Sequence, residues 1–560
     1  MTKREQALLG EAVLIVSPED RAAQRAVDAF FARQEANHFG PERAAVLLLP
    51  GEYPADFRPQ VGFYTELCGL GRRPDAVVLA GLSCPATWMG DPHNHNATCN
   101  FWRGVQNLRV TGDVMWAVSQ ATFMRRMQID GDLRLHDENG WSSGGFLADA
   151  RVGGTVDSGS QQQWLSRNCD WARWTGENWN LVFLGIEKGR APATGWPEHP
   201  YTVVPRTPLC REKPYLAETD AGLCVCVPPL RRDTAGALWP HERPDAERVL
   251  PLDAFYVAHP GDDAAALNAA LEAGRHLLFT PGIYPLDAPL RVTRADTVVM
   301  GLGFATLCPT AGTPAMTVAD VDGVCIAGLL FDAGERESPT LLEVGEHKTA
   351  RSHADRPTTL HDLWFRVGGA AAHPTAAACC LTIWQNDVLG DNFWVWRADH
   401  GAGVSWTDNR APTGVRVEGD RVTLYALLVE HYQQYQTIWN GEDGRLVFYQ
   451  SELPYDVPND AAWRSPARPG YASYKVGDHV RRHTARGVGT YSFHRDAAVE
   501  AGCVMEVPET DGMDIRNVCS VMITGHPGID HVINDYGDAA NVPGARAIVM
   551  DYQAARRGEE

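Results

Sequence analysis

The sequence predicts an all-β protein made of two tandem right-handed parallel β-helices. One motif occurs twice in the chain, at an offset of 231 to 232 residues. Short β-branched runs recur every 20 to 28 residues between Gly, Asp and Asn turns, a spacing typical of one coil in such a helix. The 53 glycines and 36 prolines favour many turns over long helices.

The repeated motif, Pro-Gly-x-Tyr followed by Gly-Leu-Gly, lies at residues 47–71 and again at residues 277–303. An amphipathic stretch precedes each copy, at residues 22–34 and 262–273. Each stretch is predicted to form a helix that caps its β-helix. We therefore expect two related domains rather than one continuous structure.

Strands are expected at the β-branched runs. Residues 76–80 and 108–110 form such runs in the first copy, and residues 297–300 and 324–327 in the second. Coils of a parallel β-helix stack at about 4.8 Å, so each run would pair with the run one coil later. A β-sandwich would instead show shorter spacings joined by hairpins.

Residues 205–250 break this rhythm because they are rich in proline and charge. We predict a first domain at residues 1–204, a linker at 205–250 with the boundary near residue 245, and a second domain at 251–560. A chain of 560 residues is long enough to fill two such domains.

The formal charge of the chain is −20, from 50 Lys and Arg against 70 Asp and Glu. Because no basic run of the kind that follows phosphates occurs, nucleic acid is not an expected partner and neutral ligands are favoured. No stretch approaches the ~20 apolar residues of a membrane helix, so no membrane association is expected. The first residues lack a signal-type apolar region, which predicts a cytoplasmic protein, or a secreted one whose leader has been removed.

The 13 cysteines are irregularly spaced and include no Cys-x-x-Cys pair. They are expected to be reduced, buried and small. His93, His95, His526 and His531 lie in loops rich in Pro, Gly and Asn, where solvated or structural histidines are common. We therefore expect no metal and no organic cofactor. Separately, a monomer is the favoured oligomeric state.

Glu430 and Glu452 are the first candidate catalytic residues. They lie 22 residues apart, about one coil, so a β-helix would place their backbones roughly 5 Å apart. Two such carboxylates cannot both ionise freely, and the less solvated one is expected to keep its proton near neutral pH and act as an acid. The alternative is that both glutamates point outward into solvent. Neighbouring Tyr, Gln and Trp residues favour the catalytic interpretation.

Gln120 and Ser143 form a second candidate pair, because their separation of 23 residues also matches about one coil. An amide and a hydroxyl at this spacing can hold one water molecule, as a neutral nucleophile requires. The alternative is a polar ladder inside the β-helix that stabilises adjacent coils. Two glycines after Ser143 favour close approach of a ligand to the backbone.

Aromatic and polar residues around the two glutamates are candidates for binding a sugar. Indole faces stack on pyranose rings, and 17 tryptophans exceed what a core of this size requires. For any single residue, packing in the core is the alternative. The candidate substrate-binding residues are Trp394, Trp396, Asp399, His400, Trp406, Gln433, Trp439, Tyr455, Tyr474 and Lys475.

The duplicated motif, Gln120, the Ser-Gly-Gly-Phe element at residues 143–146, Glu430 and Glu452 together resemble glycoside hydrolase family 55. The resemblance implies a pair of tandem β-helices of the pectate-lyase-like type and activity as an exo- or endo-β-1,3-glucanase. It covers essentially the whole chain.

The chain also resembles an actinobacterial group related to family 55, through residues 31–40 and 430–436. Members of that group often carry the label "adenylyl cyclase" or "coagulation factor 5/8 type". The sequence lacks a phosphate-binding Gly-x-x-x-x-Gly-Lys motif and a cationic cluster, so it does not support a cyclase.

The resemblance to family 55 implies inverting hydrolysis in a cleft between the two domains. It implies that Glu452 is the general acid, that Glu430 assists the water or the sugar, and that Gln120 and Ser143 hold the water. Inverting carboxyl groups usually lie about 6.5 to 9.5 Å apart, which is more than adjacent coils provide. The base is therefore expected to be a water held by Gln120, Ser143 and Glu430 together.

Two other functions stay open at the level of sequence. One is a different carbohydrate- or natural-product-modifying enzyme on the same scaffold, acting by elimination, transfer or rearrangement. The other is a non-catalytic sugar-binding protein, which would not need both carboxylates. The sequence does not distinguish the sugar, its linkage and anomer, or exo from endo action.

Overall fold

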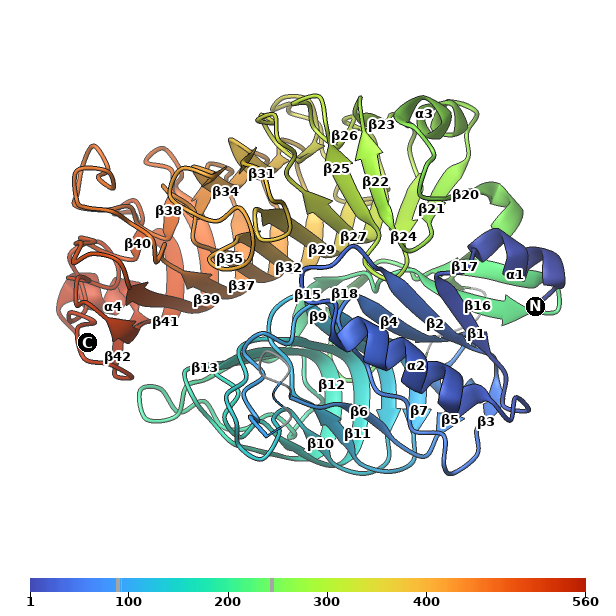
Figure 1. The fold of residues 1–560 in the computed structure, drawn as a ribbon. Helices are drawn as coiled ribbons and strands as arrows, with labels where there is room; N and C mark the ends of the chain where they lie inside the picture. Colours follow the sequence, from blue (N-terminus) through green and yellow to red (C-terminus); the bar gives the residue numbers. More distant parts are fainter. Residues whose placement is uncertain (87–90, 92, 242–245, 560) are drawn as a thin grey trace.

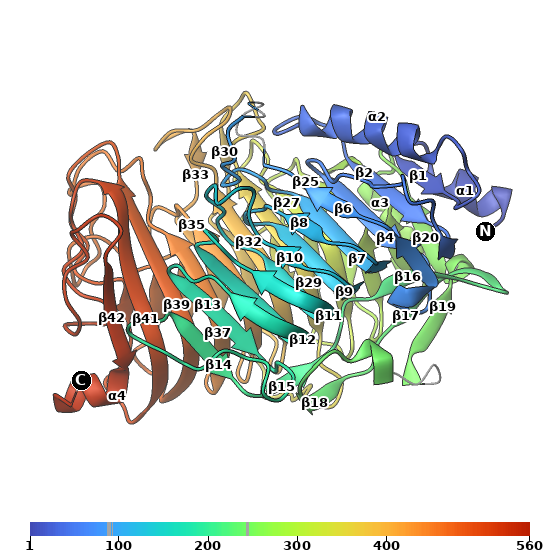
Figure 2. The same cartoon turned by 90° about the horizontal axis from the view of Figure 1, so that it is seen from below.

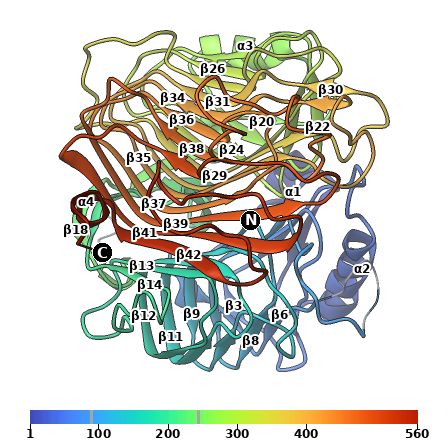
Figure 3. The same ribbon diagram turned by 90° about the vertical axis from the view of Figure 1, so that its left-hand side faces the viewer.

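The computed structural model describes residues 1–86, 91, 93–241 and 246–559. Its strands pair mostly in parallel and form two β-helices that lie side by side (Figure 1). Seen from the C-terminal end, the second β-helix lies above the first and the two share one long side (Figure 3). The predicted all-β parallel β-helix fold is confirmed.

The first β-helix is one connected 14-stranded sheet. Each strand pairs with the equivalent strand of the neighbouring coil, as between Gly104 of one coil and Phe123 of the next. Its strands are β1 (Val13–Val16), β2 (Ala44–Leu48), β3 (Gly51–Glu52), β4 (Thr65–Gly69), β5 (Val77–Leu79), β6 (Leu82–Cys84), β7 (Arg103–Val110), β8 (Val114–Trp116), β9 (Thr122–Ile129), β10 (Leu133–Arg134), β11 (Phe146–Asp157), β12 (Gln163–Thr175), β13 (Asn180–Leu184) and β14 (Tyr201–Val204).

The second β-helix consists of a 13-stranded sheet, an eight-stranded sheet and a small two-stranded sheet. Among its named strands in the described residues, only β42 pairs antiparallel with another strand, β41. The 13-stranded sheet contains β20 (Phe255–Ala258), β21 (His276–Phe279), β22 (Ile283–Leu286), β24 (Val298–Gly301), β25 (Thr306–Pro309), β27 (Cys325–Asp332), β29 (Thr359–Val367), β32 (Leu389–Arg397), β35 (Thr423–Glu430), β37 (Gly444–Glu452), β39 (Arg482–His494), β41 (Gly512–Gly525) and β42 (Arg546–Asp551).

The eight-stranded sheet lies across the apolar interior from the 13-stranded sheet. Its strands are β23 (Leu290–Val292), β26 (Met316–Val318), β28 (Leu342–Val344), β31 (Cys379–Ile383), β34 (Thr413–Val417), β36 (Thr437–Trp439), β38 (Tyr474–Val476) and β40 (Met505–Glu506). The two-stranded sheet pairs β30 (Thr375–Ala376) with β33 (Asn409–Arg410).

In the part of the chain that the structure describes, four α-helices lie at the ends and sides of the β-helices: α1 (Lys3–Leu9), α2 (Ala23–Glu35), α3 (Ala264–Glu272) and α4 (Tyr552–Arg557). Helix α2 runs along the outside of the first β-helix (Figure 2). Helix α3 begins after Asp263, whose carboxylate accepts a hydrogen bond from the amide of Ala266. The helices predicted at residues 22–34 and 262–273 are therefore present. Short 3₁₀ turns occupy Pro74–Ala76, Trp239–His241 and Leu252–Ala254.

Residues 205–250, predicted as a linker, contain two small antiparallel sheets. One pairs β15 (Thr207–Cys210) with β18 (Arg231–Thr234), and the other joins β16 (Tyr215–Thr219), β17 (Gly222–Val227) and β19 (Arg248–Pro251). The predicted boundary near residue 245 falls at residues 242–245, outside the described part of the chain. The segment also places Glu212 and Lys213 between the β-helices, where both are buried.

The long strands of both β-helices bend at one residue with left-handed backbone conformation, and these residues are aligned from coil to coil. The first row has φ between 52° and 61°, and the second between 51° and 67°. Gly, Asn and Asp dominate because they tolerate this conformation best. The first row is Asn107, Arg126, Asp149, Asn168 and Gly185, and the second is Gly328, Asp362, Asn392, Ala426, Phe448, Gly487 and Asn517.

A buried ion network joins the two β-helices. Arg125 of β9 donates to Asp362 of β29 at 2.7 Å and to Asp391 of β32 at 2.8 Å. Arg167 of β12 donates to Asp391 at 3.0 Å and to Glu212 at 2.7 and 2.8 Å. All of these side chains are buried. Each carboxylate is thus paired with a guanidinium, as buried charges require.

The rest of this network keeps it neutral. Lys213 lies 3.2 Å from Glu66 and 3.1 Å from Asp362. His361 contacts Asp391 at 2.9 Å; burial lowers the pKa of His361, but the Asp391 carboxylate outweighs burial and raises that pKa to about 9. Two arginines, one lysine and one imidazolium therefore balance four carboxylates. Positions 125 and 167 in one β-helix are locked to positions 362 and 391 in the other.

We predict that Arg125→Leu destabilises the protein by about 3–5 kcal/mol, because it leaves Asp362 and Asp391 buried without their main cation. Chemical denaturation would measure the loss. Arg109→Ala is a suitable control, because its 2.7 Å ion pair with Asp130 is at the surface and such pairs contribute less than about 1 kcal/mol. Equal losses in the two variants would contradict a structural role for the network.

Candidate active site

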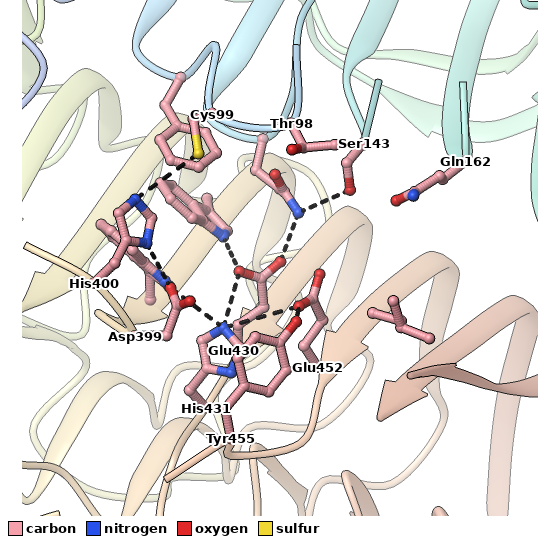
Figure 4. A pocket seen from close by; sticks show the side chains of 15 residues that line it. Thr98, Cys99, Ser143, Gln162, Asp399, His400, Glu430, His431, Glu452 and Tyr455 are labelled. Carbon is pink, nitrogen blue, oxygen red and sulfur yellow. Dashed lines mark hydrogen bonds and ion pairs between the residues drawn. The ribbon is translucent and has the colours of Figure 1, made fainter. Parts of the chain in front are cut away.

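A cavity of about 330 Å³ opens where the two β-helices meet (Figure 4). Residues of both β-helices line it, which makes the site composite. The lining residues are Thr98, Cys99, Phe101, Gln120, Ser143 and Gln162 from the first β-helix, and Trp394, Trp396, Asp399, His400, Glu430, His431, Glu452, Tyr455 and Ile523 from the second.

Glu430 and Glu452 are neighbours because they end adjacent parallel strands. Glu430 is the last residue of β35 and Glu452 the last of β37, and the two are paired in register. Their separation of one coil, predicted from sequence, is therefore present. Both carboxyl groups point into the cavity (Figure 4).

Glu430 is enclosed by N–H donors. The Gln120 side-chain amide donates to one carboxyl oxygen at 2.9 Å, and the Trp394 indole N–H donates to the other at 2.8 Å. Its side chain is 3% exposed. Burial, together with the Glu452 carboxylate, raises the pKa of Glu430 well above the usual value.

Glu452 has a different pair of partners. The Gln450 amide donates to it at 3.3 Å, and the Tyr455 hydroxyl forms a hydrogen bond with its other oxygen. The side chain is 13% exposed, so it reaches the cavity more fully than Glu430 does. Burial raises the pKa of Glu452 to about 7.

The partners decide which glutamate holds a shared proton. A protonated carboxyl must donate, and the indole and amide N–H groups around Glu430 cannot accept. A tyrosine hydroxyl can accept a hydrogen bond as well as donate one, so Tyr455, which donates to the Glu452 carboxylate, can also accept a hydrogen bond from protonated Glu452. These partners favour the proton on Glu452 and the ionised form on Glu430.

Gln120 and Ser143 lie on the opposite wall. The Gln120 amide donates to Ser143 Oγ at 3.5 Å as well as to Glu430, and the Gln163 amide donates to the same Oγ at 3.1 Å. Ser119 Oγ donates to the Gln120 carbonyl at 2.6 Å and thereby fixes the amide orientation. The amide and hydroxyl predicted to hold a water are thus placed beside Glu430.

His431 lies between three carboxyl groups. Its Nε2 is 3.8 Å from Asp399, 4.0 Å from Glu430 and 3.9 Å from Glu452. The carbonyl oxygen of Leu453, at 3.2 Å, can only accept, so Nδ1 carries the proton. Burial lowers the pKa of His431 and keeps the ring neutral.

Asp399 and His400 form an ion pair at the edge of the cavity, with 2.9 Å between carboxylate and Nδ1. Burial opposes the imidazolium, but the hydrogen bond with Asp399 outweighs burial and raises the pKa of His400 to about 10. The pair therefore adds a fixed cation and a fixed anion beside the two glutamates.

An aromatic wall closes the cavity on the side of Glu430 away from Glu452. Trp396 pairs in register with Glu430 from the preceding coil. The Trp394 and Trp396 rings stack at 4.5 Å, and Phe101 from the first β-helix lies 4.7 Å from Trp394. Flat apolar faces of this kind suit the faces of a sugar ring.

Comparison with known proteins identifies the family. The LAM55 pectate lyase-like domain model matches residues 255–452. A protein described as an exo-β-1,3-glucanase from Streptomyces sp. (strain SirexAA-E / ActE) is 44% identical over 536 residues, which cover 95% of this chain and 87% of the relative. This chain belongs to glycoside hydrolase family 55. The predicted family and the predicted glycoside hydrolase class are confirmed.

Solved structures agree with the family 55 assignment. The structure of sacteLam55A from Streptomyces sp. SirexAA-E matches with a TM-score of 0.93 and 42% identity, over 97% of this chain and 98% of that chain. A variant of sacteLam55A with one glutamate replaced by alanine, solved in complex with glucose, matches with a TM-score of 0.93 and 41% identity, over the same shares of both chains.

Nine of the predicted site residues of this family 55 enzyme line the cavity: Gln120, Ser143, Trp394, Trp396, Asp399, His400, Glu430, Glu452 and Tyr455. Trp406 lies in an adjoining hollow that shares Asp399 and His400 with the cavity. Gln433 does not line either space; its amide donates to the carbonyl of Trp406 at 2.6 Å and so supports that loop.

Three predicted substrate-binding residues lie away from the site. Trp439 and Tyr474 are fully buried inside the second β-helix, where both rings pack against His483. Lys475 pairs with Glu506 at 2.9 Å in a separate hollow. The prediction was wrong for these residues because β36 and β38 belong to the eight-stranded sheet, whose side chains face the core or the opposite surface.

Six lining residues were not predicted: Thr98, Cys99, Phe101, Gln162, His431 and Ile523. Phe101, Gln120, Ser143 and Gln162 each stand six residues before a left-handed bend of the first β-helix. Counting back from each Asn or Asp bend would therefore have found Phe101 and Gln162. The other four lack a comparable signal: Thr98 and Cys99 lie in a loop, His431 follows the end of β35, and Ile523 lies near the end of β41.

No group of three or more His, Cys, Asp or Glu residues suited to a metal ion occurs in the described parts of the chain. Within the same residues, no helix is long and apolar enough to span a membrane.

Proposed function

We propose that this family 55 enzyme hydrolyses β-1,3-linked glucan with inversion, from one end of the chain. One observation carries the proposal: Gln120 of the first β-helix donates to Glu430 of the second at 2.9 Å, one coil from Glu452. A water-holding amide, a carboxylate and a protonated carboxyl thus share one cavity. The 44% identical relative, described as an exo-β-1,3-glucanase, supports the choice of glucan.

In the proposed reaction, Glu452 gives its proton to the glycosidic oxygen as the bond to the anomeric carbon breaks. A water held by Glu430, Gln120 and Ser143 attacks that carbon from the opposite face and passes a proton to Glu430. The leaving sugar departs with the proton of Glu452, and the product carries the inverted configuration. Proton exchange with water then restores the starting state of both glutamates.

Different hydrogen-bond partners hold the two carboxyl groups, whose backbones belong to adjacent coils. Trp394 and Gln120 hold Glu430, whereas Tyr455 holds Glu452. The proposed inversion requires room for a water beside Glu430, on the side of the Gln120 amide. NMR of the first product formed from laminarioligosaccharides tests the proposal. The α-anomer is expected, the β-anomer would indicate retention, and no cleavage of laminarin within a panel of glycans would reject the substrate class.

Exo action is supported by the aromatic wall. Phe101, Trp394 and Trp396 block the cleft on the side of Glu430 opposite Glu452. A chain end can abut this wall, whereas a chain that continues in both directions cannot pass it. The 44% identical relative is described as an exo-enzyme, which agrees with this geometry.

We predict that Glu452→Gln lowers kcat by about 10²- to 10⁴-fold on laminarioligosaccharides, because the amide cannot protonate the leaving oxygen. Aryl glucosides with good leaving groups need little protonation and should lose much less. Steady-state kinetics on both substrate types measures the difference. Equal losses on both would mean that Glu452 is not the acid.

We predict that kcat/KM falls as the pH rises through about 7, where Glu452 loses its proton. The hydrogen bond from Tyr455 lowers the pKa of Glu452 by stabilising its carboxylate. Removing it in Tyr455→Phe should therefore raise that pKa and move the basic limb of the pH profile to higher pH. A limb that stays in place or moves down would contradict the role of Tyr455.

We predict that Gln120→Ala combined with Ser143→Ala lowers kcat little more than the worse single change, because the water is mispositioned only once. Kinetics of the two single variants and the double variant would show this. Melting temperatures should stay close to that of the parent. Fully additive losses in kcat, or a lowered melting temperature in each single variant, would favour the alternative of a structural polar ladder.

A further inference from the structure

One cysteine of the cavity wall, Cys99, lies beside an imidazole from the other β-helix. Its Sγ is 3.9 Å from Nε2 of His400, and Nδ1 of His400 is 2.9 Å from the Asp399 carboxylate (Figure 4). All three residues line the cavity that contains Glu430 and Glu452. A thiol, an imidazole and a carboxylate therefore follow one another along the wall of the proposed sugar site, and the proposed reaction does not use the thiol.

The imidazole presents a positive charge to the sulfur. Burial lowers the pKa of His400, but hydrogen bonds with Asp399 and Cys99 outweigh burial and raise that pKa to about 10. The Asp399 carboxylate accepts from Nδ1, so the second N–H of the imidazolium, on Nε2, faces the sulfur. Reactive cysteines occupy electropositive, partly exposed surroundings of this kind, because the thiolate is the nucleophilic form.

The other two imidazoles near this cluster are neutral. The His38 ring lies 5.5 Å from the His400 ring, and burial, together with the His400 charge, lowers the pKa of His38 to about 3. His431 lies 3.8 Å from Asp399, and burial lowers its pKa as well. The positive charge that faces Cys99 is therefore that of His400.

The turn that carries Cys99 is fixed by its neighbour Asn100. The buried Asn100 side-chain amide donates to the carbonyl oxygens of Pro85 at 3.0 Å and Ala117 at 2.8 Å. On the other side, His400 comes three residues after the end of β32. The thiol and the imidazolium are thus brought together by ordered segments of two β-helices.

Exposure separates Cys99 from most of the other thiols. Of the 13 cysteines, all of which lie in the described residues, eleven are buried, and Cys99 and Cys308 are partly exposed. Cys308 lines a separate hollow, where burial and the Asp332 carboxylate raise its pKa to about 12. A thiol that keeps its proton is a poor nucleophile. Cys308 is therefore a matched control within the same chain.

We propose that Cys99 is a modification site at which a small-molecule disulfide reacts and thereby closes the sugar cavity. In this exchange the Cys99 thiolate attacks one sulfur of the disulfide. A new S–S bond forms as the old one breaks, and the other half leaves as a thiolate that takes a proton from water. The group added to Cys99 then fills part of the 330 Å³ cavity that the sugar needs, and a free thiol reverses the exchange.

The test exposes the reduced, purified enzyme to bis(2-hydroxyethyl) disulfide, which is small and neutral, and follows each cysteine by peptide mass spectrometry. Cys99 should react about tenfold faster than Cys308, and saturating glucose should slow its reaction, because the sugar and the added group occupy one cavity. Hydrolysis of laminarioligosaccharides should fall as Cys99 is modified and return with dithiothreitol.

Three variants separate the contributions. Cys99→Ser should make hydrolysis insensitive to the disulfide, whereas Cys308→Ser should keep the activity and the sensitivity of the parent. His400→Gln removes the positive charge and should slow modification of Cys99 about tenfold. The rate at Cys308 in that variant should match the parent, which shows that the fold is kept.

Equal reaction rates at Cys99 and Cys308 would overturn the inference, and so would full modification of Cys99 without loss of hydrolysis. The loss of activity rests on the proposed function, whereas the modification does not. If the unmodified enzyme fails to cleave laminarioligosaccharides, the proposed function is rejected. The two cysteine rates and the protection by glucose then still decide whether Cys99 is a reactive site in the cavity.

Discussion

The buried ion network between the two β-helices is the constraint on which the active site depends. Arg125 and Arg167 come from one β-helix, and Asp362 and Asp391 from the other. Sliding one β-helix along the other by a coil would leave these charges unpaired in the interior, at a cost of several kcal/mol each. Because that movement is blocked, Gln120 can meet Glu430 although 310 residues separate them in the chain. The site is assembled by the interface rather than by either β-helix alone.

Within that frame, the neighbours of the two glutamates favour opposite protonation states. Both are buried, and burial raises the pKa of each. The two glutamates differ in their hydrogen-bond partners. The indole N–H beside Glu430 can only donate, whereas the Tyr455 hydroxyl beside Glu452 can also accept. The fixed charges of Asp399 and His400 lie close by and act on both. The proposed acid and the proposed carboxylate thus differ in the partners that surround them.

The sequence predicted those features that depend on the length of one coil. The pairings of Glu430 with Glu452 and of Gln120 with Ser143 follow from separations of 22 and 23 residues, because neighbours in a parallel β-helix are one coil apart. It did not predict which sheet a residue occupies, and so Trp439 and Tyr474 were assigned to the site although they lie in the core. The sequence also could not predict contacts between the two β-helices, because residues that meet across them have no fixed separation along the chain. His431, held among three carboxyl groups, depends on such three-dimensional closure.

The aligned left-handed bends have a consequence for how such a protein can diversify. In the first β-helix the side chain six residues before a bend faces the cleft, and in the second the side chain four residues after a bend does so. Substitutions at these positions change the lining of the cleft. Duplication of one coil would add one cleft-facing position to that β-helix and would keep the order of the other positions. Substrate specificity can therefore change through single substitutions at these positions. Loops on the far side of the β-helix can vary in length without moving the cleft-facing side chains. Residues that recognise the substrate can therefore change independently of residues that maintain the fold.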